Sequence, residues 1–114
     1  MATFSKQPLS GDSTGKGILV SATATTGTTI HTTSSRTTFD EIWLYATNND
    51  AASVNLTIEF GETTSTKVIT QAIPATSGLT IIVPGLILGP DLTIGAFASS
   101  AGKVVITGYV NRIS

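Results

Sequence analysis

The segment SGDSTGKG, residues 10–17, matches part of a phosphate-binding loop. Such a loop needs Gly, four residues and then Gly-Lys followed by Ser or Thr, and it joins an apolar strand to a helix whose N–H groups hold the anion. Here Ser10 replaces the first glycine and Gly17 replaces the metal-binding hydroxyl. The segment GILVSATATT that follows is typical of a strand. The sequence therefore argues against nucleotide binding and predicts a flexible polar joint.

His31 is the only histidine of the chain, and catalytic histidines usually have acidic and nucleophilic partners. The nearest acids, Asp40 and Glu41, follow a Ser/Thr-rich loop, and the sequence has no G-x-S-x-G nucleophile turn. A Ser-His-Asp assembly stays open in a chain so rich in Ser and Thr. A surface histidine on an exposed strand is the favoured interpretation, and we expect no catalytic residue and no enzymatic activity.

Paired carboxylates, as used in glycoside hydrolysis, are a second arrangement that does chemistry. Asp40 and Glu41 are adjacent, so on a strand they point to opposite faces and cannot act together. Glu59 and Glu62 flank Gly61 at the end of an expected strand. We interpret these two as solvated charges beside a turn.

Metal binding has little support in the residue types. Asn48, Asn49 and Asp50 offer oxygen ligands that a calcium ion accepts, but their spacing is not that of an EF-hand. The chain has no cysteine, which excludes thiolate metal sites and disulfides. We expect no metal and no cofactor.

Trp43 and Tyr45 are the aromatic residues with the most informative spacing. Two positions apart on a strand, they share a face and could stack against a sugar ring or a partner protein. Because both faces of EIWLYATN are apolar, we favour a place in the core or in a subunit interface, with Ile42, Leu44 and Ala46 turned outward or into a neighbour.

The elements that position these residues are strands. VNLTIEF alternates apolar and polar residues, and the turn-forming NNDAAS joins it to EIWLYATN as a hairpin. Turn residues, among them the SSR step at 34–36, separate further expected strands. No segment shows the apolar spacing of a helix. The additional strands are expected at residues 17–25, 28–33, 66–73, 79–83, 92–98 and 103–112.

About eight short strands predict an all-β, single-domain antiparallel β-sandwich, and their number favours a jelly roll over an immunoglobulin-like fold. We expect a flexible N-terminal arm over residues 1–15 and a sandwich domain over residues 16–114. The arm holds two large apolar residues, Phe4 and Leu9, which are candidate partner contacts together with Trp43 and Tyr45.

The composition limits the classes of partner that the chain is expected to bind. Only 11% of the 114 residues are charged, against about 25% in average soluble domains, and the six Lys and Arg residues are scattered. We therefore expect no nucleic-acid partner. The longest apolar run, LTIIVPGLILG, is broken by Pro84 and Gly85, and the N-terminus lacks the apolar stretch of a secretory signal, so we expect no membrane segment and synthesis in the cytoplasm.

Three segments besides EIWLYATN are apolar on both faces: LTIIVPGLIL, LTIGAFA and KVVITGYV. A two-sheet sandwich buries only one face of each sheet, so the excess predicts that another chain covers part of the outer surface. We expect a homo-oligomer, most simply a trimer.

Four segments together, MATFSKQPLSGDSTGKGI, DEIWLYATN, IIVPGLIL and VVITGYVNRI, make this chain similar to the small decoration (cement) proteins of tailed-bacteriophage capsids. The resemblance implies a β-sandwich or jelly roll that binds the major capsid protein on the outer surface of the virion, as an oligomer and without a cofactor or an active site. It also implies that the arm, anchored by Phe4 and Leu9, lies on an adjacent subunit or on the capsid protein.

The alternative function is that of a small phage tail, fibre or spike module that binds host-surface carbohydrate. Its contact residues would be Trp43, Tyr45, Asn48, Asn49 and Asp50. Copy number separates the two functions, because a decoration protein is present in hundreds of copies per particle and a tail component in a handful.

Overall fold

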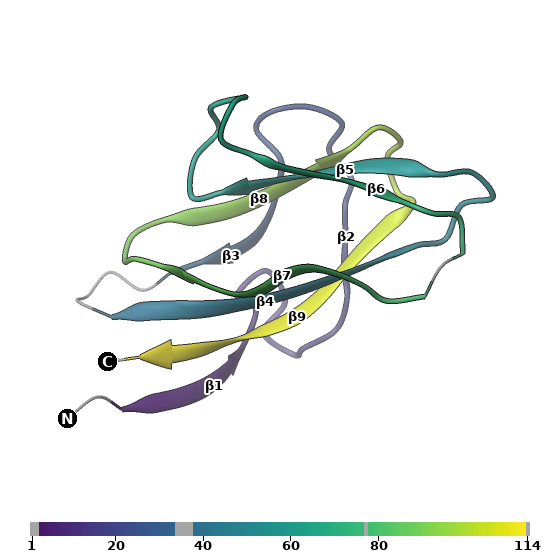
Figure 1. Ribbon diagram of the computed structural model, residues 1–114. Helices are drawn as coiled ribbons and strands as arrows, with labels where there is room; N and C mark the ends of the chain where they lie inside the picture. Colours follow the sequence, from purple (N-terminus) through teal and green to yellow (C-terminus); the bar gives the residue numbers. More distant parts are fainter. Residues whose placement is uncertain (1–2, 34–37, 77, 114) are drawn as a thin grey trace.

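A computed structural model describes residues 3–33, 38–76 and 78–113 as two antiparallel β-sheets packed face to face (Figure 1). The described residues form nine strands and no helix. The turn expected at residues 34–36 lies outside them. The strands are β1 (Phe4–Pro8), β2 (Ile18–Leu19), β3 (Thr28–Thr32), β4 (Phe39–Asn48), β5 (Val54–Phe60), β6 (Ile69–Ile73), β7 (Thr80–Leu88), β8 (Thr93–Ala98) and β9 (Val104–Ile113).

The strand order confirms the expected all-β sandwich. One sheet, here called sheet A, has the order β1-β9-β4-β7, and β2 also pairs with β9. The other, sheet B, has the order β3-β8-β5-β6. Consecutive strands often belong to different sheets, so the chain passes repeatedly across the core between them (Figure 1). The jelly-roll form of the sandwich stays a prediction.

The core lies between the two sheets and is built by alternation along the strands. In β4, Ile42, Leu44 and Ala46 are fully buried, whereas Trp43 and Tyr45 lie half-buried on the outer face of sheet A. Of the two places expected for the aromatic pair, the core is therefore wrong, and the subunit interface stays a prediction. The face that carries Trp43 also carries Glu41 and, across β9, Asn111. Burying it between the sheets would cost the desolvation of these polar groups.

Strand β7 runs through Pro84 and Gly85, although the sequence predicts a strand that stops at residue 83. The register between β4 and β7 shifts twice around this point, which accommodates the irregular backbone. Pro84 is tolerated because β7 is at the edge of sheet A. Gly85 has a φ of 84°, and a Cβ there would lie 2.8 Å from a ring carbon of Trp43. Both constraints require glycine.

The predicted N-terminal arm contains a strand of the sandwich. Phe4 to Pro8 pair with β9 from Ile113 back to Tyr109, which places the two ends of the described chain side by side (Figure 1). Leu9 is buried in the core, and the N–H of Gly11 donates to the carbonyl of Ile30 at 2.9 Å. The expectation of a flexible arm is therefore wrong for residues 4–9, because the hydrogen bonds to β9 and the burial of Leu9 fix them to the sandwich.

This strand leads to a stability prediction. Replacing Leu9 with Ala removes a buried side chain, and we expect the free energy of unfolding to fall by about 2–4 kcal/mol. The control Thr64→Ala, at an exposed position of the loop between β5 and β6, should alter it by less than about 0.5 kcal/mol. Urea unfolding followed by tryptophan fluorescence measures both. Equal stabilities of the two variants would contradict the placement of Leu9 in the core.

Candidate functional site

The outer face of sheet A is the most apolar exposed surface of the described residues. Cross-strand partners share a face of a sheet, so the register places Ile113 between Phe4 and Phe39, and Tyr45 beside Ile81. All seven large hydrophobic side chains that are exposed in the described residues lie on strands of sheet A or directly beside one. They are Phe4, Leu19, Phe39, Leu79, Ile81, Leu86 and Ile87.

A fixed aromatic cluster occupies the middle of this face. The rings of Trp43 and Tyr109 stack with their centroids 6.1 Å apart and their planes at 11°. The ammonium of Lys6 lies 4.9 Å from the centroid of Tyr109, a cation–π geometry. Trp43 Nε1 and Asn111 Nδ2 donate to the same carboxylate oxygen of Glu41, at 2.8 and 3.0 Å. The indole N–H, the Asn111 amide and the Glu41 carboxylate therefore have hydrogen-bond partners within the cluster.

These contacts also set the charge of the face. Hydrogen bonds from Asn111 and then Trp43 hold the pKa of Glu41 below its ordinary value, so this carboxylate is ionised at neutral pH. The positive charge of Lys6 lies on the same face. The centre of the face is thus aromatic and carries one charge of each sign. Aromatic residues are enriched at the centres of protein interfaces, whereas Lys and Glu are depleted there.

The outer face of sheet B has a different character. Its exposed positions include Thr29, Asn55, Thr70, Ala72 and Thr93, which are polar or small. No large hydrophobic residue of the described chain is exposed on β3, β5, β6 or β8. The excess of apolar residues that the sequence shows is therefore concentrated on one side of the molecule.

Of the four candidate partner contacts, the structure brings three to the outer face of sheet A. Trp43 and Tyr45 lie there together with Phe4, whereas Leu9 is buried and cannot touch a partner. Sequence reasoning did not single out Phe39, Ile81 or Tyr109. The signal for the last two was present in the segments LTIIVPGLIL and KVVITGYV, whose second apolar face forms part of this surface.

His31 is buried at 1% exposure, so the expectation of a surface histidine is wrong. Its Nδ1 accepts the backbone N–H of Ser10 at 3.0 Å, and its Nε2 lies 2.7 Å from Oδ2 of Asp40. The ring proton is therefore on Nε2, which donates to Asp40. This contact was not foreseen because the pairing of β3 with β8 shifts register between Thr29 and His31. The shift breaks the alternation and buries His31 as well as Ile30, with His31 beside Ile94 on β8.

The surroundings of His31 differ from those of a catalytic triad. In a triad, one ring nitrogen takes the proton of the serine hydroxyl and the other is held by the acid. Here Ser10 offers its backbone N–H to the ring, while its Oγ accepts the N–H of Thr32 at 2.7 Å. Neither ring nitrogen is left to take a proton from a nucleophile. The network joins strands β3 and β4, which belong to opposite sheets.

Asp40 is the most buried charge of this network. Its carboxylate accepts hydrogen bonds from Nε and Nη2 of Arg112, at 2.9 and 3.1 Å. The two bonds form a bidentate ion pair between β4 and β9. Burial alone raises the pKa of Asp40, but the hydrogen bonds from Arg112 and His31 outweigh burial and leave that pKa below its ordinary value. Glu41, the next residue, points to the outer face, which confirms that the two acids cannot act together.

The segment SGDSTGKG forms a turn-rich loop before β2. The Asp12 carboxylate accepts the N–H of Thr14 at 2.9 Å, and the N–H of Gly15 donates to the carbonyl of Asp12. The loop leads into a two-residue strand, whereas a phosphate-binding loop opens a helix. The geometry thus agrees with the sequence argument against nucleotide binding.

Asn48 is engaged in the connection between β4 and β5. These two strands belong to different sheets and do not pair, so the hairpin expected for NNDAAS is wrong. Its amide nitrogen donates to the carbonyls of Ala52 and Ile73, and its oxygen accepts the N–H of Asp50. The side chain is fully buried, so it is separated from Trp43 and Tyr45 on the outer face. No group of three or more His, Cys, Asp or Glu side chains within the described residues is placed to hold a metal ion.

Comparison with known proteins returned no match to any family model, curated protein sequence or solved structure. In the part of the chain that the structure describes, there is no helix of the length and apolarity required to cross a membrane.

The buried carboxylate predicts a dependence of stability on pH. Because the pKa of Asp40 is lower in the folded chain than its ordinary value of 3.8, the unfolded chain takes up the proton first as the pH falls. The stabilisation that the Asp40 carboxylate contributes is complete above its ordinary pKa and is lost as the pH falls through its pKa in the folded chain. We expect the free energy of unfolding of the wild type to fall more steeply below about pH 4 than that of Asp40→Asn.

Urea unfolding of both proteins at a series of pH values measures these slopes, whatever the absolute stability of the variant. Parallel pH profiles would contradict an ionised, stabilised Asp40.

Proposed function

We propose that this chain is a structural virion protein that decorates and stabilises the outer surface of a phage capsid, in contact with the major capsid protein and with copies of itself. The observation that carries the proposal is the concentration of exposed hydrophobic side chains on sheet A, with none on the strands of sheet B among the described residues. An apolar face of this kind marks an interaction surface in a protein that is otherwise poor in charge.

The fold also agrees with the proposal, although it is less specific to this function than the exposed apolar face. Decoration proteins of the type that the sequence resembles are sandwiches or jelly rolls. The orders β1-β9-β4-β7 and β3-β8-β5-β6 suit the jelly-roll form, because each sheet mixes early and late strands and the chain alternates between sheets. The proposal thus includes a jelly roll.

We assign the outer face of sheet A to contact between copies of the chain within a trimer. In a cyclic trimer, one part of this face meets a different part of the same face on the next copy. No single-sign charge opposes that contact, since Lys6 and Glu41 have opposite signs and are both held by side chains of the face. The stacked pair Trp43 and Tyr109 is fixed before association, so little side-chain entropy is lost on binding. The remaining surface is free to meet the major capsid protein.

The alternative, a tail, fibre or spike module that binds carbohydrate, has weaker support. The Trp43–Tyr109 stack could serve as a platform for a sugar ring. However, one of the expected sugar-contact residues is separated from the others, because Asn48 is buried and its amide nitrogen donates to two backbone carbonyls. Sugar specificity needs free polar groups beside the aromatic ring, and Asn48 does not provide one.

The trimer assignment predicts the effect of one charged substitution. We expect light scattering at micromolar concentration to return three times the 11.7 kDa chain mass for the wild type and the monomer mass for Ile81→Asp. Ile81 is 58% exposed, so the variant loses little of the core and should keep its β-sheet circular dichroism. The control Thr70→Asp, on an exposed position of sheet B, should remain trimeric. A monomeric wild type would overturn the assignment.

Copy number tests the function itself. A tagged copy of the gene is expressed in its source, particles are purified on a density gradient, and the chain is quantified against the major capsid protein by mass spectrometry. We expect hundreds of copies per particle. A handful of copies would favour the tail module, and absence from particles would overturn both virion functions.

A further inference from the structure

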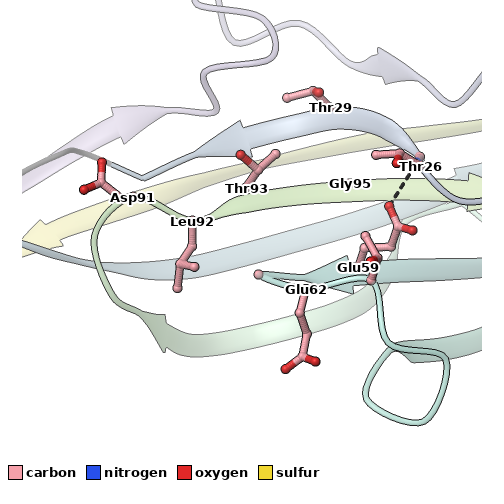
Figure 2. A pocket seen from close by; sticks show the side chains of 11 residues that line it. Thr26, Thr29, Glu59, Glu62, Asp91, Leu92, Thr93 and Gly95 are labelled. Carbon is pink, nitrogen blue, oxygen red and sulfur yellow. Dashed lines mark hydrogen bonds between the residues drawn. The ribbon is translucent and has the colours of Figure 1, made fainter.

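A cavity of about 220 Å³ lies on the outer side of sheet B, on the opposite side of the sandwich from the proposed interface. It is bordered by the segment before and within β3, by the end of β5 with the turn that follows, and by the start of β8. In Figure 2, Glu59, Glu62 and Asp91 line the cavity from different parts of the chain, and the carboxylates of Glu62 and Asp91 point away from that of Glu59.

Glu59 is the unusual residue of this cavity. It was expected to be a solvated charge, but its side chain is buried, with 2% exposure. Its Oε1 accepts the N–H of Gly27 at 2.7 Å, and no described residue donates to its buried Oε2. A Cβ at position 95 would lie 2.7 Å from Oε1, so Gly95 leaves the room that the carboxylate occupies. A buried carboxylate with an unpaired oxygen destabilises the fold unless a donor reaches it.

The charge around Glu59 has one sign. Two further acids, Glu62 and Asp91, line the cavity, and none of its 11 lining residues is Lys, Arg or His. Four threonines supply hydroxyl groups that donate or accept. Three of the seven acidic residues of the chain therefore line one small cavity, and of these only Glu59 is buried. Such a site favours a cation.

The residues that line the cavity, and its volume, limit the kind of ligand that it can bind. A metal ion is not supported, because the described acids are not grouped closely enough to coordinate one. A sugar is not supported either, because the lining contains no aromatic ring for stacking. The volume is below the range of about 300–1,000 Å³ that holds drug-sized ligands. A single side-chain head group or a short amine suits this volume.

We propose that the cavity binds one alkylammonium or guanidinium group, carried by a lysine or arginine side chain of another chain or by a free amine. Its N–H groups donate to the Glu59 carboxylate, and Glu62 and Asp91 attract its charge. The last torsion angle of a glutamate is broad, so the carboxylate turns toward the donor without movement of β5. This site lies on sheet B and does not depend on the proposed function.

Titration calorimetry and NMR with four probes test the proposal. The probes are N-acetyl-arginine amide, N-acetyl-lysine amide, butylamine and the neutral isostere N-acetyl-citrulline amide. We expect saturable binding of the cations, weakened by added salt, and no binding of the citrulline probe. Tighter binding of the amino-acid amides than of butylamine assigns the site to a protein side chain, and the reverse assigns it to a free amine.

Variants locate the binding. Glu59→Gln keeps the shape of the side chain but removes the charge, so we expect at least a tenfold loss of affinity together with an unchanged or higher melting temperature. The control Asp12→Asn, in the loop before β2, should bind as the wild type does. If Glu59→Gln fails to fold, the double variant Glu62→Gln/Asp91→Asn should still fold and bind several-fold more weakly.

Three results would overturn the proposal. They are no saturable binding of any cation at millimolar concentration, equal binding of the citrulline probe, and full affinity in folded Glu59→Gln or in the double variant.

Discussion

The alternation of side chains along β4 is the constraint on which the rest of the structure depends. This strand lies in the middle of sheet A, paired with β9 on one side and β7 on the other. With Ile42, Leu44 and Ala46 turned into the core, the period of two places Trp43 and Tyr45 on the outside. A sandwich of two sheets has one inner face per sheet, so a strand that is apolar on both sides leaves its second face for solvent or another chain. The proposed assembly follows from that surplus.

The buried polar groups determine how the two sheets meet. His31 on β3 and Asp40 on β4 join sheet B to sheet A, and Arg112 on β9 completes the hydrogen bonding of the carboxylate. Such a network favours one arrangement of strands, because any other leaves a buried charge without a partner. The outer surfaces are then distinct, with an aromatic, nearly neutral face on sheet A and an acidic cavity on sheet B. Each is a candidate for a different contact.

The all-β class and most strand positions could be predicted because alternation is local; VNLTIEF and EIWLYATN, for example, show it within a few residues. Strand β1 was missed because FSKQP has no apolar alternation and forms only against β9. The length of β7 was missed because Pro84 breaks a central strand but is tolerated at an edge. The partners of Asp40 lie 9 and 72 residues away, and the burial of Glu59 depends on Gly27 and Gly95, so neither environment has a local signal.

The central claim is that the outer face of sheet A is covered by another copy of the chain. Hydroxyl-radical footprinting of the assembled protein, with a monomeric sheet A variant as the reference, tests it most directly. Trp43 and Tyr109 report on sheet A, and the half-buried Phe97 reports on the outer face of sheet B. The account predicts strong protection of Trp43 and Tyr109 on assembly and unchanged oxidation of Phe97. Protection of Phe97 with Trp43 and Tyr109 oxidised equally in both states would contradict it.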